Sequence, residues 1–379
     1  MTTRISDLHI AREDALPSPE SLHQALPCAE PQAAFIARSR EAVRRILRGE
    51  DDRLLVIVGP CSIHDPQAAV EYATRLRDAA MQRQDTLLPV MRVYFEKPRT
   101  RMGWKGLIYD PDLDGEGDIA KGLRAARGLL LECAALGVPA ASEILDLVTP
   151  QYYAELLSWG AIGARTVESP LHRQMASALS APVGFKNATH GGIDVAIDAI
   201  HVAQQAHRFP SISMEGRAIV VSTTGNPDGH LVLRGASSAP TGFALPPEGA
   251  QSPWGGPAVT GGPNHDAASV AKAAQALVSA GLAPRLLIDC SHGNSAKDYR
   301  RQPLVAAEVA AQVAGGSQAI AGVLLESHLF EGKQEIVNGR QGLTYGQSVT
   351  DGCIGWDQTV GVLDALAAAV MQRRRALGT

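Results

Sequence analysis

The segment LLVIVGPCSIHDPQAAVEYATRLRDAAMQR, residues 54–83, contains the pattern that decides the fold. It begins with five consecutive apolar residues, which is typical of a strand buried on both faces, as in a parallel sheet. From residue 66 onward, apolar residues recur at spacings of three and four, which predicts an amphipathic helix. Asp65 and Pro66 suit the N-cap and the first turn of that helix. The segment therefore predicts one strand followed by one helix.

The same unit recurs along the chain. The predicted strands are LLVIV (54–58), VMRVYF (90–95), VPAASE (138–143), AIGARTV (161–167), VGFK (183–186), AIVVS (218–222), RLLIDC (285–290) and AGVLLE (321–326). Eight strand–helix units favour an α/β fold, a closed (β/α)8 TIM barrel. An open doubly wound sheet is the alternative. No GxGxxG motif opens the first helix, which weakens the dinucleotide-binding version of that alternative.

Two segments fall outside this repeat. Residues 31–48 predict an additional helix before the first strand. We therefore interpret residues 1–50 as an N-terminal extension that supplies oligomer or regulatory contacts, and residues 51–379 as the catalytic barrel. Residues 235–263 are rich in Gly and Pro and contain few apolar side chains, which predicts a long exposed loop inserted after the sixth strand.

Composition excludes several classes of protein. The chain has 379 residues, of which 45% are hydrophobic and 20% charged, and its formal net charge is −4. This apolar content is too high for a disordered protein, and the charge balance gives no reason to expect nucleic acid as a partner. No apolar run reaches the roughly 20 residues of a membrane helix, and the N-terminus lacks the apolar region of a secretory signal. The five cysteines are odd in number and scattered, which favours free thiols in the cytoplasm.

Polar or ionisable residues stand at or just beyond each predicted strand end, where a barrel places its active site. Cations predominate among them: Arg92, Lys97, Arg99, Arg165, Lys186 and Arg234. Such a cluster is costly unless anions neutralise it, and Arg and Lys are the usual partners of phosphate and carboxylate. The sequence therefore predicts ligands that carry two or more anionic groups.

The same face collects Cys61, His292 and Glu326, with Asp351 in the following loop. A thiolate, an imidazole and carboxylates suit a divalent transition metal but do not choose among Mn, Fe, Co, Zn and Cu. Each residue also has a structural interpretation, because a lone cysteine is most often a small buried hydrophobe and a lone carboxylate often caps a helix. The metal site is favoured because all of these residues fall where the barrel places its chemistry.

Several long motifs resemble the type I 3-deoxy-D-arabino-heptulosonate 7-phosphate (DAHP) synthases. They include GPCSIHDPQAAVEYATRL (59–76), MRVYFEKPRTRMGWKGLIYDPDLDG (91–115), PVGFKN (182–187), IDCSHGNS (288–295) and SVTDGCIGWDQT (348–359). The resemblance covers nearly the whole chain. It implies a metal-dependent condensation of phosphoenolpyruvate with D-erythrose 4-phosphate and water, which gives DAHP and phosphate as the first step of the shikimate pathway.

The resemblance also implies site residues, position by position. The family's metal ligands fall on Cys61, His292, Glu326 and Asp351, and the expected metal is Mn2+, Fe2+, Co2+ or Zn2+. Its phosphoenolpyruvate contacts fall on Arg92, Lys97, Arg165, Lys186 and Arg234, with Glu143 nearby. Its KPRT motif, which binds erythrose 4-phosphate, is Lys97-Pro98-Arg99-Thr100.

We expect a mechanism that uses these groups as follows. Arg165 and Arg234 bind the phosphate of phosphoenolpyruvate, while Arg92 and Lys186 bind its carboxylate. Lys97 protonates the developing alkoxide, with a pKa that neighbouring cations lower. The metal acts as a Lewis acid on the aldehyde, and either a metal-bound hydroxide or Glu143 activates the water.

Feedback inhibition by Phe, Tyr or Trp and assembly as a homodimer or homotetramer are further implications. The positions that resemble the inhibitor pocket are Pro150, Gln151, Leu179, Ser180, Phe209 and Val221, with Asp7 from a neighbouring subunit. The chain departs from the family pattern at Arg101, where a small polar residue is usual, at Tyr109, where Asn is common, and in the longer segment 235–263.

Three alternative functions remain open at this point. The nearest is 3-deoxy-D-manno-octulosonate 8-phosphate synthase, which condenses arabinose 5-phosphate, but the KPRT motif and the N-terminal extension disfavour it. A barrel aldolase with a Schiff base at Lys186 is the second alternative. A non-catalytic amino-acid sensor is the third, and the retained metal-ligand positions disfavour it.

Overall fold

The computed structural model describes residues 5–99, 102–237 and 262–378. Within these ranges, eight parallel strands close into a barrel in the order β1-β10-β9-β8-β5-β4-β3-β2. The barrel strands are β1 (Leu54–Gly59), β2 (Leu87–Arg92), β3 (Ala140–Glu143), β4 (Trp159–Ile162), β5 (Val183–Lys186), β8 (Gly229–Leu233), β9 (Leu286–Asp289) and β10 (Ile320–Glu326). Every residue of β1 and β10 is buried, as expected for strands covered on both faces. The predicted (β/α)8 TIM barrel is confirmed.

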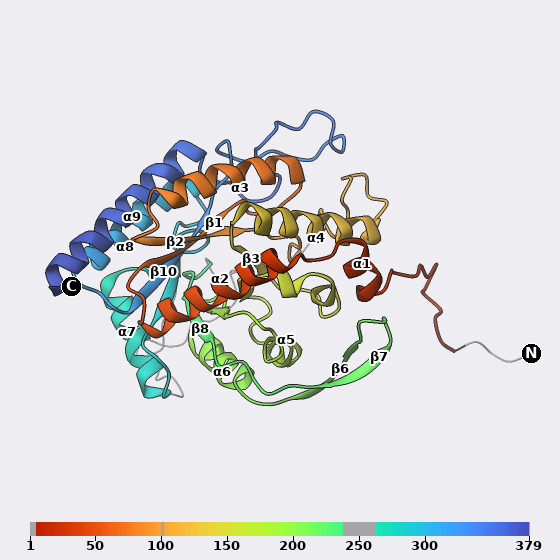
Figure 1. Cartoon of the computed structure of the whole chain (residues 1–379), viewed down its shortest axis with the longest axis horizontal. Coiled ribbons are helices and arrows are strands. Elements are labelled where there is room, and N and C mark those ends of the chain that lie inside the picture. The colour runs from red at the N-terminus through yellow and green to blue at the C-terminus, as the bar shows by residue number, and fades with distance from the viewer. Residues whose placement is uncertain (1–4, 100–101, 238–261, 379) are drawn as a thin grey trace, which may run out of the picture.

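Helices surround the barrel (Figure 1). They are α3 (Pro66–Met81), α4 (Ile119–Leu136), α5 (Pro170–Ala176), α6 (Asp194–Ala203), α7 (Ala267–Ser279), α8 (Gln302–Ala314) and α9 (Trp356–Leu377), with short 3-10 turns η1 (Thr149–Tyr152), η2 (Ala154–Leu156) and η3 (Tyr299–Arg301). Asp65 caps α3 by accepting backbone hydrogen bonds, as its sequence position predicts. Within the described residues, no helix combines the length and the apolar character needed to span a membrane.

The prediction that AIVVS (218–222) is the sixth barrel strand is wrong. These residues form β7 (Ala218–Ser222), which pairs antiparallel with β6 (Arg208–Ile212) in a separate ribbon outside the barrel (Figure 1). β7 has the composition of a buried strand, yet most of its residues are exposed. The sixth strand is β8, which begins with Gly229 and His230 and therefore has only three consecutive large apolar residues. Arg234 nevertheless stands at the end of the sixth strand, because it directly follows β8.

The N-terminal extension contributes α1 (Pro19–Ala25) and α2 (Glu30–Arg48), and α2 is part of the barrel core. Val43 and Ile46 of α2 are fully buried in one cluster with residues of the barrel strands, including Leu55 and Trp159. The apolar side of α2 therefore closes the barrel interior at the end opposite the predicted active site.

A buried histidine in this interior predicts how stability depends on pH. His230 accepts a hydrogen bond from Trp159 Nε1 at 3.0 Å, and burial lowers the pKa of His230 to about 4. An unfolded histidine has a pKa near 6.5, so below that pH the unfolded state binds a proton that the folded state excludes. Its contribution to stability is therefore present above about pH 6.5 and is lost as the pH falls toward 4.

We expect the free energy of unfolding at pH 5 to be about 2 kcal/mol lower than at pH 7 through His230 alone. His230→Asn should reduce this pH dependence, whereas Leu231→Ala on the same strand should lower stability equally at both pH values. Urea titrations at the two pH values measure the difference. The same pH dependence in the wild type and in His230→Asn would contradict the prediction.

Candidate active site

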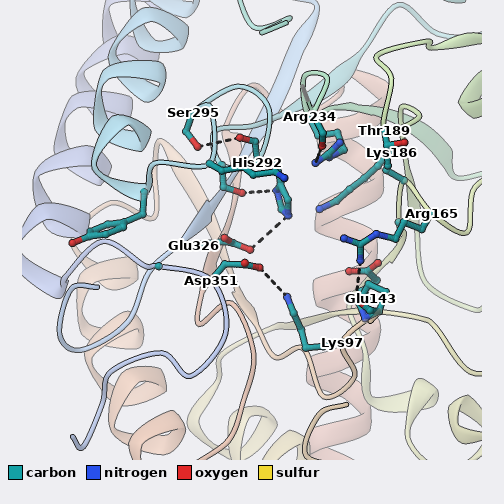
Figure 2. A pocket seen from close by; sticks show the side chains of 18 of the residues that line it. Lys97, Glu143, Arg165, Lys186, Thr189, Arg234, His292, Ser295, Glu326 and Asp351 are labelled. Carbon is teal, nitrogen blue, oxygen red and sulfur yellow. Dashed lines mark hydrogen bonds and ion pairs between the residues drawn. The ribbon is translucent and has the colours of Figure 1, made fainter. Parts of the chain in front are cut away.

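A cavity of about 380 Å3 opens at the C-terminal ends of the barrel strands. Its wall includes the predicted residues Lys97, Arg99, Glu143, Arg165, Lys186, Arg234, His292, Glu326 and Asp351. Figure 2 shows two facing halves, with His292, Glu326 and Asp351 on one side and Arg165, Lys186 and Arg234 on the other. Thr100 and Arg101 lie outside the described residues.

Three of the predicted metal ligands are close together: Glu326 and Asp351 in the cavity wall, and Cys61, which is fully buried next to them. Single ligand atoms of Cys61, Glu326 and Asp351 all lie within 4.8 Å of one another. Burial raises the pKa of the Cys61 thiol to about 12, so the thiol is protonated and donates to Asp351 Oδ2 at 3.3 Å. A divalent cation would displace this proton, because a coordinated thiol is deprotonated. The donor set therefore fits a transition metal.

His292 stands beside this group rather than within it. Its Nε2 lies 3.9 Å from Glu326 Oε1, while its Nδ1 lies 2.9 Å from Asp289 Oδ2. A carboxylate on the outer ring nitrogen is the usual arrangement for a metal-binding histidine, because it fixes the ring orientation and the tautomer. His292 also has a left-handed backbone, with φ of 54°, a strained conformation often found at functional sites.

Asp289 was missed by the sequence analysis. It ends β9, is fully buried, and accepts from Lys186 Nζ at 2.9 Å as well as facing His292. The available signal was an acidic residue at the end of the apolar run RLLIDC. That signal indicates burial but not the two partners, which come from different parts of the chain.

Arg92 lies beneath the cavity. It is 1% exposed and donates to Glu326 Oε1 at 3.0 Å and to the Pro60 carbonyl at 3.2 Å. Its guanidinium carbon lies 3.6 Å from the centre of the Tyr94 ring. In this structure Arg92 therefore positions Glu326.

The opposite wall is cationic. Burial lowers the pKa of Arg234, as does the charge of Arg165, and within the described part of the chain neither guanidinium has a carboxylate partner. Arg165 donates to the Pro98 carbonyl at 2.7 Å, and Arg234 contacts Ser237 Oγ at 3.4 Å. Two adjacent arginines without a carboxylate favour the binding of an anion such as phosphate.

Lys97 extends from a loop toward the metal-ligand group (Figure 2). Its Nζ lies 3.0 Å from Cys61 Sγ and 3.7 Å from Asp351 Oδ2. The prediction of a lowered pKa is wrong in its net direction, although burial and the charge of Arg92 do lower the pKa of Lys97. Cys61, Asp351 and Glu326 raise it by more, so the net direction is upward. Lys97 is therefore protonated and can donate a proton.

Two backbone segments, one from each half of the cavity, pack closely against each other. A Cβ on Gly293 would lie 2.5 Å from the Ala236 carbonyl oxygen, and one on Gly235 would lie 2.6 Å from the Asn294 nitrogen. Gly293 directly follows His292, and Gly235 directly follows Arg234. Any side chain larger than hydrogen at Gly293 therefore pushes apart the loops that carry these two residues.

We expect Gly293→Ala to lower kcat by roughly 100-fold, since a displacement of about 1 Å at reacting groups has effects of that size. Gly128→Ala is the matched control, because no heavy atom lies within 4 Å of its added Cβ in α4. The control should keep full activity. Steady-state kinetics of both variants test this, and equal activities would contradict it.

The positions predicted for an inhibitor lie away from this cavity. Phe209 and Val221 face each other as paired residues of the β6–β7 ribbon, and Gln151 Nε2 lies 3.5 Å from Ser211 Oγ of that ribbon. The remaining positions are Pro150, which is buried in η1, Leu179 and Ser180, which precede β5, and Asp7, which is exposed near the N-terminus. The structure therefore brings Gln151 of η1 against the ribbon that carries Phe209 and Val221.

The substituted residue Tyr109 also lies outside the cavity wall. Its hydroxyl contacts Asp146 Oδ2 at 3.1 Å, and Asp146 in turn accepts from the backbone of η1 and the residue before it. Tyr109 therefore supports the turn that carries Pro150 and Gln151.

All five cysteines are free thiols.

The sequence matches a known protein family over most of its length. Residues 28–245 and 257–364 match the DAHP synthetase I family, and the interruption at 246–256 falls inside the segment predicted as an insertion. The chain is 49% identical over 374 residues to the Phe-sensitive phospho-2-dehydro-3-deoxyheptonate aldolase of Escherichia coli (strain K12), covering 99% of this chain and 100% of the relative. It is 48% identical over 368 residues to the Tyr-sensitive enzyme of the same strain, covering 97% and 96%.

Two further comparisons agree. The Trp-sensitive phospho-2-dehydro-3-deoxyheptonate aldolase of Enterobacter agglomerans is 48% identical over 370 residues, covering 98% of this chain and 99% of the relative. The solved structure of phospho-2-dehydro-3-deoxyheptonate aldolase from Francisella tularensis SCHU S4 is similar with a TM-score of 0.88 and 46% identity, covering 96% of this chain and 99% of that one.

Proposed function

The chain belongs to the DAHP synthetase I family, and we propose that it carries out the family reaction in the cavity described above. It condenses phosphoenolpyruvate with D-erythrose 4-phosphate and water, giving DAHP and inorganic phosphate as the first step of the shikimate pathway. The main support for placing the reaction in this cavity is its cationic wall. Arg165, Lys186 and Arg234 form that wall and face the metal-ligand group on the other side of the cavity. The cationic half suits an anionic substrate, and the metal-ligand half suits an aldehyde whose carbonyl a bound metal would polarise.

Phosphoenolpyruvate binds against the cationic wall. Its phosphate contacts Arg165 and Arg234, whose lack of a carboxylate partner among the described residues supports this role. Its carboxylate contacts Lys186, which Asp289 holds in place at 2.9 Å. Arg92 acts from beneath by keeping Glu326 oriented.

Cys61, His292, Glu326 and Asp351 would hold one divalent ion, Mn2+, Fe2+, Co2+ or Zn2+. Bound there, the ion supplies Lewis acidity toward the aldehyde oxygen of erythrose 4-phosphate. The proximity of the Cys61, Glu326 and Asp351 ligand atoms supports this assignment, and so does the Asp289 carboxylate on the outer nitrogen of His292.

The chemical step forms a bond between C3 of phosphoenolpyruvate and the aldehyde carbon. The aldehyde oxygen gains negative charge, and Lys97 Nζ donates a proton to it, which its protonated state and its position beside Asp351 support. The C2=C3 double bond supplies the electrons of the new bond, which leaves C2 electron-poor, and water adds there as it loses one proton. Glu143, which lies on the wall beside Arg165, accepts the proton of that water. The C2–O bond to phosphate then breaks, and the remaining hydroxyl becomes the C2 carbonyl as its proton passes to the departing phosphate.

Phosphate release tests the assignment. The enzyme loaded with Mn2+ should release phosphate from phosphoenolpyruvate only when erythrose 4-phosphate is also present, and should prefer it strongly over arabinose 5-phosphate. A preference for arabinose 5-phosphate would instead indicate the octulosonate synthase. Borohydride inactivation in the presence of a keto substrate would indicate a Schiff base at Lys186.

Aromatic amino acids inhibit this enzyme at a site separate from the cavity. Relatives are named Phe-, Tyr- and Trp-sensitive, and the β6–β7 ribbon carries Phe209 and Val221 beside Gln151. Titration of activity with each amino acid separately identifies the effector. Light scattering distinguishes the proposed homodimer from a homotetramer, and removal of residues 1–18 tests the contribution of the N-terminal segment.

A further inference from the structure

Three buried asparagines adjoin the cationic wall of the cavity and have no role in the mechanism above. Asn187 follows β5, Asn264 precedes α7 and Asn294 lies in the loop after β9. Asn264 Nδ2 donates to Asn187 Oδ1 at 3.3 Å, and the backbone N of Asn264 donates to Asn294 Oδ1 at 2.7 Å. Asn264 therefore joins the other two residues into one asparagine cluster.

This cluster holds the backbone of Arg234 and of the residue after it. Asn187 Oδ1 accepts from the backbone N of Arg234 at 2.7 Å, and Asn264 Oδ1 accepts from the backbone N of Gly235 at 2.7 Å. The carbonyl of Arg234 accepts from the backbone N of Asn294 at 3.3 Å. Both backbone polar groups of Arg234 are thus bound to the asparagine cluster.

The side chain of Arg234 has little else to fix its direction. Its guanidinium donates to the Gly235 carbonyl and to Ser237 Oγ, both at 3.4 Å, which is long for a hydrogen bond. Among the residues that the structure describes, no carboxylate lies within ion-pair distance of it, and Arg165 nearby carries the same charge. The orientation of the guanidinium therefore depends on the backbone that the asparagine cluster holds.

The cluster also links Arg234 to Lys186, the other cation assigned to phosphoenolpyruvate (Figure 2). Asn187 directly follows Lys186, and β5 and β8 pair with Lys186 opposite Val232. Asn187 continues this pairing, because its backbone N donates to the Val232 carbonyl at 3.1 Å while its side chain binds the backbone N of Arg234. These bonds fix the spacing between the two cations.

We propose that Asn264 is a positioning residue for phosphoenolpyruvate, which with Asn187 and Asn294 holds Arg234 ready for the phosphate before the substrate binds. This inference rests on the proposed function. Because folding already orders the guanidinium, binding of the substrate costs less conformational entropy. Asn264 does not line the cavity and forms or breaks no covalent bond. It follows the segment 235–263 in sequence, whereas the arginine that it positions precedes that segment.

Steady-state kinetics of Asn264→Ala test the inference. The KM for phosphoenolpyruvate should rise about 10-fold, an effect of the size that one buried hydrogen bond supplies, and the KM for erythrose 4-phosphate should stay at the wild-type value. kcat should fall much less, because a bound phosphate then orients the guanidinium. Asn264→Ser, whose hydroxyl is one bond shorter than the amide oxygen, should change the same KM and provides the measurement if the alanine variant does not fold.

Asn226→Ala is the matched control. Asn226 is also a buried asparagine that holds backbone, since its Nδ2 donates to the carbonyls of Leu179 and Ala181, but it does not line the cavity or contact the asparagine cluster. Its replacement should lower the free energy of unfolding and leave both KM values unchanged.

Two further measurements separate positioning of Arg234 from a general structural role. Asn264→Ala should raise the inhibition constant of inorganic phosphate by the same factor as the KM for phosphoenolpyruvate. It should leave the inhibition constant of pyruvate unchanged, because pyruvate has the carboxylate but no phosphate. In an Arg234→Gln background, Asn264→Ala should weaken phosphoenolpyruvate binding no further, since a residue that acts through another is not additive with it.

The outcomes distinguish this inference from the function on which it rests. An unchanged KM for phosphoenolpyruvate, an equal loss of pyruvate affinity, or a full effect in the Arg234→Gln background would overturn the role of Asn264 while leaving the proposed function intact. A wild type that releases no phosphate from the two substrates would instead overturn the proposed function.

Discussion

Lys97→Met will lower kcat by about 1,000-fold, within the range expected for loss of a general acid. Methionine keeps the length and apolar stem of lysine but has no proton to donate. The Lys97 Nζ lies 3.0 Å from Cys61 Sγ and 3.7 Å from Asp351 Oδ2, so the lost proton is one delivered at the metal-ligand group. Single-turnover measurements with both substrates at saturation separate this effect from weaker binding.

Metal affinity provides a second measurement for the same variant. Removing a positive charge beside Cys61 and Asp351 should leave the affinity for Mn2+ unchanged or increase it, since a cation no longer competes with the ion. Lys272→Met on α7 is the matched control and should keep full turnover. Turnover by Lys97→Met within tenfold of the wild type would contradict the role of Lys97 as the general acid.

Cys61→Ala will remove most metal binding and, with it, most activity at stoichiometric metal. Loss of a residue that only orients a ligand typically lowers metal affinity 10- to 100-fold, so loss of the ligand itself should lower it by more than about 100-fold. The change is small in volume, and Cys61 is a protonated thiol in the absence of metal, so the fold should be retained. Calorimetric titration with Mn2+ measures the affinity directly.

Cys133→Ala is the control for this change. Cys133 is also a buried free thiol, but it lies in α4 among apolar side chains, away from the cavity. Its replacement should leave metal affinity and activity unchanged. A Cys61→Ala protein that binds Mn2+ as tightly as the wild type would exclude Cys61 as a ligand, and activity that survives a chelator would exclude the metal from the reaction.

The barrel and most of the charged residues of the cavity were predictable from sequence because both depend on local signals. Unbroken apolar runs indicate strands buried on both faces, and parallel strands of a barrel bring their C-terminal ends to one face. The long motifs around Cys61, Lys97, His292 and Asp351 also indicated which family the chain resembles. Arg234 was placed correctly even though the strand before it was not, because its position depends only on the end of β8.

The order of residues in the sequence alone determined the fold class of this protein and predicted anionic ligands for it, since apolar periodicity and the cations at strand ends belong to single short segments. Tertiary structure decided what depends on distant partners. It moved AIVVS out of the barrel, because a β-branched run does not specify which strand it pairs with. It reversed the direction of the Lys97 pKa shift, because the sign depends on Cys61, Asp351 and Glu326, which are remote in sequence. It also brought Lys186 of β5 against Asp289 of β9, a contact that only closure of the barrel creates.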